Sequence, residues 1–154
     1  MKTLYFETIT LIERLHHLFL DVIKVELDRL HIVDINNVQC FILYNVAKNE
    51  MTVGEIANRG YYLGSNVSYN LKKLVQHGYF IQEQVVHDKR ARKIKLSEKG
   101  LKLYGKINKL FTQHADNLKH NKLTDEDLTE VTKILRSLES YWNFILSHGD
   151  VKQE

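Results

Sequence analysis

The sequence predicts a mainly α-helical protein, in which a winged helix-turn-helix with a two-stranded β-wing lies between longer flanking helices. Both ends of the 154-residue chain repeat apolar residues every three or four positions, the period of an amphipathic helix. Six of the seven glycines fall within residues 54–105, where part of the chain alternates apolar and polar residues as strands do. We therefore expect dimerisation helices over residues 1–33 and 100–154 and a winged module over 34–99, in one intertwined unit.

The first helix is expected over residues 4–30, and apolar side chains follow it along two stripes. One stripe consists of Leu11, Leu15, Leu18, Val22 and Val25, and the other of Ile12, Phe19, Ile23 and Leu30. Two stripes indicate burial on two sides, so this helix can pack on its own domain and on a second chain. A second helix is expected over residues 36–48, capped by Asp34 or Asn36. On it, Cys40 is interpreted as a small buried apolar residue rather than a redox switch.

Two shorter helices follow in the middle of the chain. Thr52 and Glu55 form a Thr-x-x-Glu capping box, which starts a helix of two turns that Gly60 ends. After the turn YYLG, another helix is expected from Ser65 to His77, and Gly78 stops it.

The period then changes to two, which indicates a β-hairpin. Its strands are expected over residues 79–85 and 92–97, joined by the basic tip VHDKRA. Ser97 caps a helix that reaches about residue 120, and Thr124 caps the last helix. The last helix has a heptad-like apolar seam of Leu128, Val131, Leu135, Leu138, Trp142 and Ile145. Such a seam favours pairing of helices between two copies of the chain.

Positive charge is concentrated in the middle of the chain. Residues 52–100 carry nine Lys or Arg and four Asp or Glu, whereas the rest carries 13 basic and 15 acidic residues. A concentrated positive field favours a polyanionic partner for the middle segment.

The helix that starts at Ser65 is apolar on one face and carries small polar groups on the other. Its outward residues are Ser65, Asn66, Ser68, Tyr69, Lys72 and Lys73. Short hydrogen-bonding side chains suit the first turns of a helix in the major groove, where they reach base edges. Lysines further along suit phosphates. The alternative, in which Ser and Asn only cap the helix, does not account for four outward polar residues.

The tip of the hairpin is basic as well, with Lys89, Arg90 and Arg92 close together. Charge runs are usually solvated turns, but the tip of a wing lies beside the recognition helix. An arginine there can enter a narrow minor groove, where the potential is most negative. Asp88 would repel phosphate, so we expect it to hold a neighbouring arginine through a bidentate pair.

Two short motifs enclose the second strand of the hairpin: Asp88-Lys89-Arg90 before it, and Leu96-Ser97-Glu98-Lys99-Gly100 after it. They resemble the wing pattern of the MarR family of bacterial regulators, Asp-x-Arg followed by Leu-Ser/Thr-x-x-Gly. The resemblance implies that Arg90 enters the minor groove, that Asp88 orients it and that the helix from Ser65 reads double-stranded DNA.

The segment RGYYLGSNVSYNLKKLV, residues 59–75, most resembles LdtR-type members of the family. This resemblance implies control of cell-wall remodelling or osmotic-stress genes. Glu83 and Gln84 depart from the family pattern. Many members have an arginine near these positions, so the phosphate or structural contact that the resemblance implies there has no matching arginine in this chain.

The resemblance further implies a homodimer, built from the first and the last two helices, on a pseudo-palindromic operator. In many members a small, often aromatic and anionic ligand enters between these helices and the DNA module. We assign His16, Phe19 and Tyr44 as the candidate residues for a small aromatic or amphiphilic effector; ordinary core or surface roles are the alternative.

Other classes of function have less support in the sequence. HExxH, GxSxG and phosphate-loop motifs are absent, so we expect neither an enzyme nor a cofactor. A metal-responsive regulator of the same fold would use Glu13 and His17, one helical turn apart, with His114 and His120. A basic protein-interaction module is the third possibility, and it would bind DNA weakly and without sequence preference.

No apolar run is long enough to span a bilayer, and the N-terminal residues lack the continuous apolar core of a signal peptide. The single cysteine excludes an internal disulfide, which favours a reducing compartment. We therefore expect a cytoplasmic protein with no membrane partner.

Overall fold

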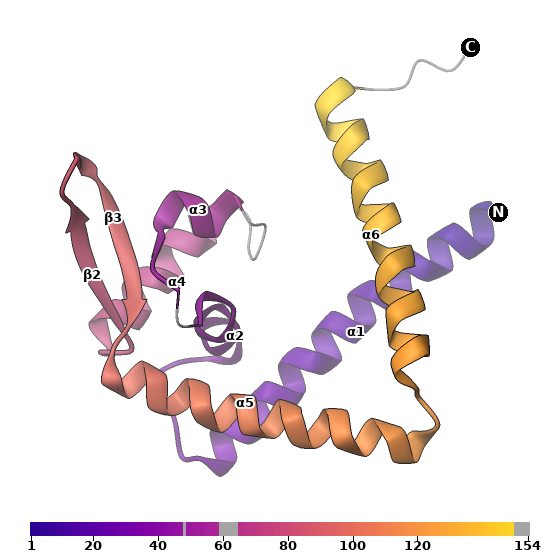
Figure 1. The fold of residues 1–154 in the computed structure, drawn as a ribbon, viewed down its shortest axis with the longest axis horizontal. Coiled ribbons are helices and arrows are strands. Elements are labelled where there is room, and N and C mark those ends of the chain that lie inside the picture. Colours follow the sequence, from indigo (N-terminus) through magenta and orange to yellow (C-terminus); the bar gives the residue numbers. More distant parts are fainter. Residues whose placement is uncertain (48, 59–64, 150–154) are drawn as a thin grey trace. The chain divides into compact units, whose positions relative to one another are not determined.

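The computed structural model describes residues 1–47, 49–58 and 65–149, with the side chains of Ser65 and Lys89 outside the description. Its elements along the chain are α1 (Lys2–Arg29), α2 (Asn37–Val46), β1 (Met51–Thr52), α3 (Val53–Asn58), α4 (Ser65–Gln76), β2 (Phe80–Val85), β3 (Asp88–Leu96), α5 (Glu98–Leu118), a 3-10 turn (Lys119–Asn121) and α6 (Asp125–His148) (Figure 1). The chain divides into two compact units, Met1–Asn108 and Lys109–Glu154. The predicted helix end at Gly60 and the turn YYLG lie outside the described residues.

The two apolar stripes of α1 have different surroundings. In the stripe of Ile12, Phe19, Ile23 and Leu30, Ile23 is fully buried and the other three are partly buried. Leu20 and Leu27, which belong to neither predicted stripe, are buried beside Ile23. The stripe from Leu11 to Val25 is exposed along its whole length, with Leu15 and Leu18 each more than half exposed. One side of α1 therefore belongs to the core of the first unit, and the other side is an apolar surface.

Asn36, rather than Asp34, caps α2. Its side chain accepts a hydrogen bond from the backbone N–H of Gln39, whose side chain accepts one from the backbone N–H of Asn36. Cys40 is buried on this helix, and burial raises the pKa of its thiol to about 12. The thiol is therefore neutral at physiological pH, which fits the interpretation of Cys40 as a small apolar residue.

The wing belongs to a three-stranded antiparallel sheet with the order β1-β3-β2, one strand more than the alternation predicted. β1 pairs Met51 with Ile94, but its two residues are too short to show a period of two. The hairpin tip is also shorter than predicted, because β3 begins at Asp88 and not at residue 92. Residues 88–91 are mostly charged and carry no apolar alternation, although their backbone lies in the strand.

The core of the first unit is formed by residues from every element of the winged module. Its fully buried members include Ile42, Leu43, Val46, Ile56, Val67, Leu74, Ile94 and Ile107. Three of the four aliphatic residues of α4, Val67, Leu71 and Leu74, are buried, as expected for a helix with one apolar face. The opposite face of α4 is left for solvent or a partner.

The second unit consists of the end of α5, the 3-10 turn and α6. Thr124 caps α6 as predicted, in a reciprocal pair with Asp127 that also lowers the pKa of the Asp127 carboxyl through hydrogen bonds. The first half of the apolar seam of α6 is exposed, with Leu128, Val131 and Leu135 each more than 40% accessible. The second half, Leu138, Trp142 and Ile145, is partly buried. None of the described helices combines the length and the hydropathy that a bilayer crossing requires.

Candidate DNA interface

The first turns of α4 present the small polar groups that the sequence predicted. Asn66, Ser68, Tyr69 and Lys72 are exposed, and Tyr69 is 58% accessible. Lys73 is only half exposed, and its Nζ lies 5.7 Å from the centroid of the Tyr69 ring. At this distance the ammonium is attracted to the ring face, so Tyr69 and Lys73 form one unit on the helix surface.

A groove of about 500 Å³ runs between α4 and the sheet. It is lined by Val53, Ser68, Leu71, Lys72, Val75, Gln76, Gln82, Arg92 and Ile94. The groove brings together Ser68 and Lys72 on α4 with Arg92 on β3. All three were predicted to contact DNA, and Ser68 and Arg92 are more than 20 positions apart in the sequence. None of the described residues that line it is acidic.

Gln76 and Gln82 also line this groove, and the sequence reasoning missed both. Gln76 could have been found, because Ser68, Lys72 and Gln76 follow one another at a spacing of four and share one face of the helix. Gln82 depends on the pairing of β2 with β3, where it faces Ile94. With a hydroxyl, two amides and two cations, the groove offers donors suited to phosphate oxygens and amides suited to base edges.

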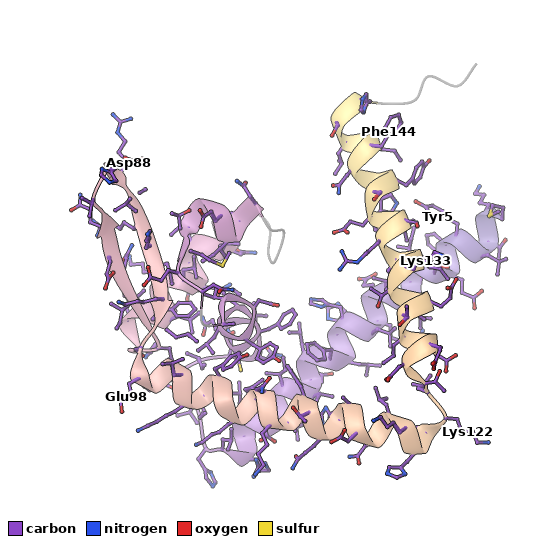
Figure 2. All side chains as sticks on the ribbon, in the orientation of Figure 1. Tyr5, Asp88, Glu98, Lys122, Lys133 and Phe144 are labelled. Atoms are coloured by element: carbon purple, nitrogen blue, oxygen red, sulfur yellow. The ribbon has the colours of Figure 1, made fainter. Side chains whose placement is uncertain are left out.

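The wing carries Asp88 at its tip (Figure 2). Oδ1 of Asp88 accepts a hydrogen bond of 2.9 Å from the backbone N–H of Arg90. We expected a bidentate pair with an arginine side chain; among the described residues the carboxylate contacts the backbone instead, as in an Asx-turn. This contact fixes the main chain from which the exposed Arg90 side chain leaves the hairpin.

Two lysines of β3 have acidic partners. Lys95 Nζ lies 2.7 Å from Glu83 Oε1 on β2, and Lys93 Nζ lies 4.0 Å from Glu50 Oε2. The hydrogen bond with Glu83 raises the pKa of Lys95. Glu83, one of the two departures from the family pattern, thus holds a cross-strand ion pair. The positive charge of the hairpin is concentrated at its tip and at Arg92 in the groove.

The C-terminal end of α4 is closed by a Schellman motif. Gly78 has φ 79°, and the N–H groups of Gly78 and Tyr79 bond the carbonyls of Val75 and Leu74. The backbone N–H of Ser97 and its Oγ, at the start of α5, both lie 3.0 Å from the carbonyl oxygen of Tyr79. The loop after α4 is therefore attached to the first turn of α5.

The candidate effector residues lie on an aromatic surface of the first unit. His16 and Phe19 on α1 each face Phe41 on α2, with ring centroids 6.5 and 5.2 Å away. Tyr44 stacks on Tyr104 of α5 at 5.2 Å, and its hydroxyl lies 3.1 Å from Oδ1 of Asn108. Partial burial, together with Tyr104, raises the pKa of Tyr44. Phe41 therefore contacts both His16 and Phe19, whereas Tyr44, the third candidate effector residue, contacts α5 instead.

The alternative metal site was predicted from Glu13 and His17 together with His114 and His120, and Glu13 and His17 lie near each other. Nε2 of His17 lies 4.0 Å from Oε1 of Glu13, and both side chains are largely exposed. Within residues 1–47, 49–58 and 65–149, no three His, Cys, Asp or Glu side chains are grouped as a metal ion requires.

Comparison with known proteins relates this geometry to a family. Residues 35–100 match the model of a winged helix DNA-binding domain. The exopolysaccharide II synthesis transcriptional activator ExpG of Rhizobium meliloti is 32% identical over 145 residues, which cover 94% of this chain and 75% of ExpG.

Solved structures share the fold at lower identity. The MarR protein from Peptoclostridium difficile matches with a TM-score of 0.73 at 19% identity, over 87% of this chain and 86% of that one. S. aureus MepR, in its complex with DNA, matches with a TM-score of 0.71 at 21% identity, over 86% of this chain and 96% of that one. The fold and these relatives are those of transcriptional regulators and not of enzymes: the chain belongs to the MarR family of winged helix transcriptional regulators.

Proposed function

We propose that this regulator binds DNA sequence-specifically as a homodimer, with α4 in the major groove and the hairpin tip at the adjacent minor groove. The observation that carries the proposal is the groove shared by α4 and β3. There Ser68, Lys72 and Arg92 converge with two amide side chains, and the lining holds no acid among its described residues.

The roles of the side chains follow from their reach. Asn66 and Ser68 stand at the start of α4, where short side chains meet base edges. Lys72 and Arg92 lie on the two sides of the groove and suit a phosphate backbone between them. Arg90 extends from the turn that Asp88 fixes and suits the minor groove.

A homodimer is supported by the apolar surfaces that each unit leaves exposed. The outer stripe of α1 and the first half of the seam of α6 are both solvent-accessible in the single chain, and contiguous apolar surfaces of this kind mark interaction sites. A two-fold dimer would place two copies of α4 on half-sites about one helical turn apart, which requires a pseudo-palindromic operator.

Effector control and target genes are further parts of the proposal. The aromatic surface around Phe41 supports a small aromatic or amphiphilic effector. Similarity to LdtR-type members favours cell-wall or osmotic-stress genes, while ExpG is described as an activator of exopolysaccharide II synthesis. The place of action in this proposal is the cytoplasm, where the DNA is.

The decisive experiment measures binding of the purified protein to overlapping duplexes from its own upstream region. Fluorescence anisotropy at several salt concentrations would compare each duplex with a scrambled one. One duplex bound far more tightly than its scrambled form, by two subunits, supports the proposal. Equal weak binding to every duplex, with a steep salt slope, favours a basic protein-interaction module.

Asn66→Ala tests base reading by α4. We expect a loss of about 1–3 kcal/mol in discrimination between operator and scrambled duplex, because a bidentate contact with adenine disappears. Asn117→Ala, an exposed asparagine on α5, is the matched control and should bind as the unmodified protein does. An equal loss on both duplexes would make Asn66 a phosphate contact or a helix cap.

Arg90→Ala tests the wing. We expect weaker operator binding with unchanged thermal unfolding, since the Arg90 side chain is exposed and Asp88 holds only its backbone. If the guanidinium also lies near a phosphate, the salt slope should fall by about 0.9 per lost contact. Arg136→Ala on α6 serves as the control, and unaltered affinity of Arg90→Ala would remove the wing from the mechanism.

A further inference from the structure

We propose that Asp34, Tyr79 and Lys99 form a positioning cluster, which fixes the direction of α4 and thereby sets operator affinity without touching DNA. The cluster rests on the proposed function, because it acts through the DNA-reading face of α4. Below, these three residues are called the Asp34 cluster.

The Asp34 cluster joins three segments that are far apart in the sequence. The hydroxyl of Tyr79, just after α4, donates a hydrogen bond of 2.8 Å to Oδ1 of Asp34, which precedes α2. Lys99 Nζ, in the first turn of α5, donates a hydrogen bond of 2.9 Å to Oδ2 of the same carboxylate. Both carboxylate oxygens are thus engaged, each by a donor from a different segment.

Lys99 also holds the end of α4 directly. Its Nζ donates a hydrogen bond of 2.8 Å to the carbonyl oxygen of His77 and lies 4.3 Å from the centroid of the Tyr79 ring. A cation at the C-terminus of a helix stabilises the carbonyls that have no partner within the helix. The same ammonium therefore connects Asp34, the last turn of α4 and the aromatic ring that follows it.

The protonation states keep this arrangement in place at neutral pH. Partial burial opposes ionisation of Asp34, but the hydrogen bonds from Lys99 and Tyr79 outweigh it and lower the pKa of the carboxyl. Burial, followed by the hydrogen bond to Asp34 and its charge, raises the pKa of Tyr79. The carboxylate stays charged and the phenol stays a donor, so all the hydrogen bonds of the Asp34 cluster persist.

A second polar contact holds the middle of α4. Asn70 is buried, and its Oδ1 accepts a hydrogen bond of 3.2 Å from Nε2 of Gln39 on α2. Apolar burial is non-directional, whereas hydrogen bonds depend on angle and distance. One contact at Asn70, in the middle of α4, and another at Tyr79, just after its C-terminal end, therefore restrain the helix at two places along its length.

Loss of the Asp34 cluster would leave the end of α4 attached to α5 through the hydrogen bonds from Ser97 to the Tyr79 carbonyl, so the helix could tilt more easily about its buried contact at Asn70. Any tilt about that point moves the start of α4, where Asn66 and Ser68 lie, and base contacts require placement to within a hydrogen-bond length. Phosphate contacts tolerate such a shift better, because the long side chain of Lys72 adjusts. The Asp34 cluster should therefore matter more for the operator than for scrambled DNA.

Tyr79→Phe is the first variant to test, because it removes the hydroxyl and keeps the ring. We expect operator binding to weaken roughly three- to tenfold, the range of one net hydrogen bond, and binding to scrambled duplex to change by less. Tyr141→Phe, an exposed tyrosine on α6, is the control for loss of a phenol. Lys99→Met should weaken operator binding in the same way, and Lys99→Arg should restore it.

A second readout does not depend on DNA. Hydrogen exchange of the Gly78 and Tyr79 amides, which close α4, should be faster in Tyr79→Phe and Lys99→Met, while exchange in α2 and α6 stays unchanged. Operator affinity and exchange equal to those of the unmodified protein would overturn the proposal. The proposal would also be overturned if affinity for the operator and for the scrambled duplex fell equally, in proportion to the fraction of the variant that is unfolded.

The two proposals can fail separately. If the unmodified protein shows no preference for any upstream duplex, sequence-specific reading by α4 fails, and exchange at Gly78 and Tyr79 still decides whether the Asp34 cluster fixes the helix. If Tyr79→Phe does not fold, operator binding and hydrogen exchange are compared between Lys99→Met and Lys99→Arg instead.

Discussion

Replacing Gly100 with alanine should destabilise the protein by about 3 kcal/mol, the upper part of the range for overpacking of a well-packed site. A Cβ at this position would lie 2.2 Å from the carbonyl oxygen of Tyr79 and 3.0 Å from Cδ2 of Leu96. The carbonyl is backbone and cannot rotate away. It also accepts the hydrogen bond from the backbone N–H of Ser97, so moving it breaks the attachment of α5 to the end of α4.

Gly105→Ala is the matched control, because it lies on the same helix and a Cβ there meets nothing within 4 Å. The control should stabilise the protein by roughly 0.5–1 kcal/mol, the difference in helix propensity between glycine and alanine. Urea unfolding monitored by circular dichroism measures both. Equal urea midpoints for Gly100→Ala and Gly105→Ala would show that α5 can shift at no cost in stability. The close approach of Gly100 to the Tyr79 carbonyl would then not require a glycine.

Gly100 also gives a physical reason for the motif Leu96-Ser97-Glu98-Lys99-Gly100. Leu96 is buried, the Ser97 hydroxyl lies 3.1 Å from the backbone nitrogen of Gly100, and Lys99 binds Asp34. Glu98 stands at the start of α5 (Figure 2), where a negative charge is favourable. Each position of the motif therefore serves the junction between the wing, α5 and the end of α4.

Local chemistry explains which parts of the fold the sequence could predict. Caps at Asn36, Thr124 and Ser97 and the glycine stop at Gly78 are encoded within a few residues of each helix end. The apolar period along α4 was enough to place its buried face. These signals need no knowledge of distant residues, so one sequence is sufficient to find them.

The features that were missed depend on pairing across the chain. The second strand partner of β3 is β1, which is only two residues long. Gln82 enters the groove through its register opposite Ile94, and Asp34 meets Tyr79 across 45 positions. The charge count also gave no sign of which cations are paired, as Lys95 is with Glu83 on the neighbouring strand. Such contacts follow from the fold and leave no local periodicity.

A charge on the outer stripe of α1 should separate the proposed dimer. Leu18 is 53% exposed in the single chain, and Leu18→Glu would place a carboxylate where the second copy should bury apolar surface. An unpaired buried charge is strongly unfavourable, so we expect monomers in sedimentation velocity. Binding to a duplex with two half-sites should weaken at least about 100-fold, because the second α4 no longer binds at high effective concentration.

Val33→Glu is the matched control, since Val33 is 92% exposed and lies outside the stripe. It should remain a dimer with unchanged affinity. Binding of Leu18→Glu to a single half-site should equal that of the unmodified protein, because the winged module is untouched. A dimer that persists in Leu18→Glu would exclude the outer stripe of α1 as the interface. An unmodified protein that sediments as a monomer and is destabilised by Leu18→Glu would mean that its own chain covers the stripe, and the pseudo-palindromic operator would then lose its physical basis.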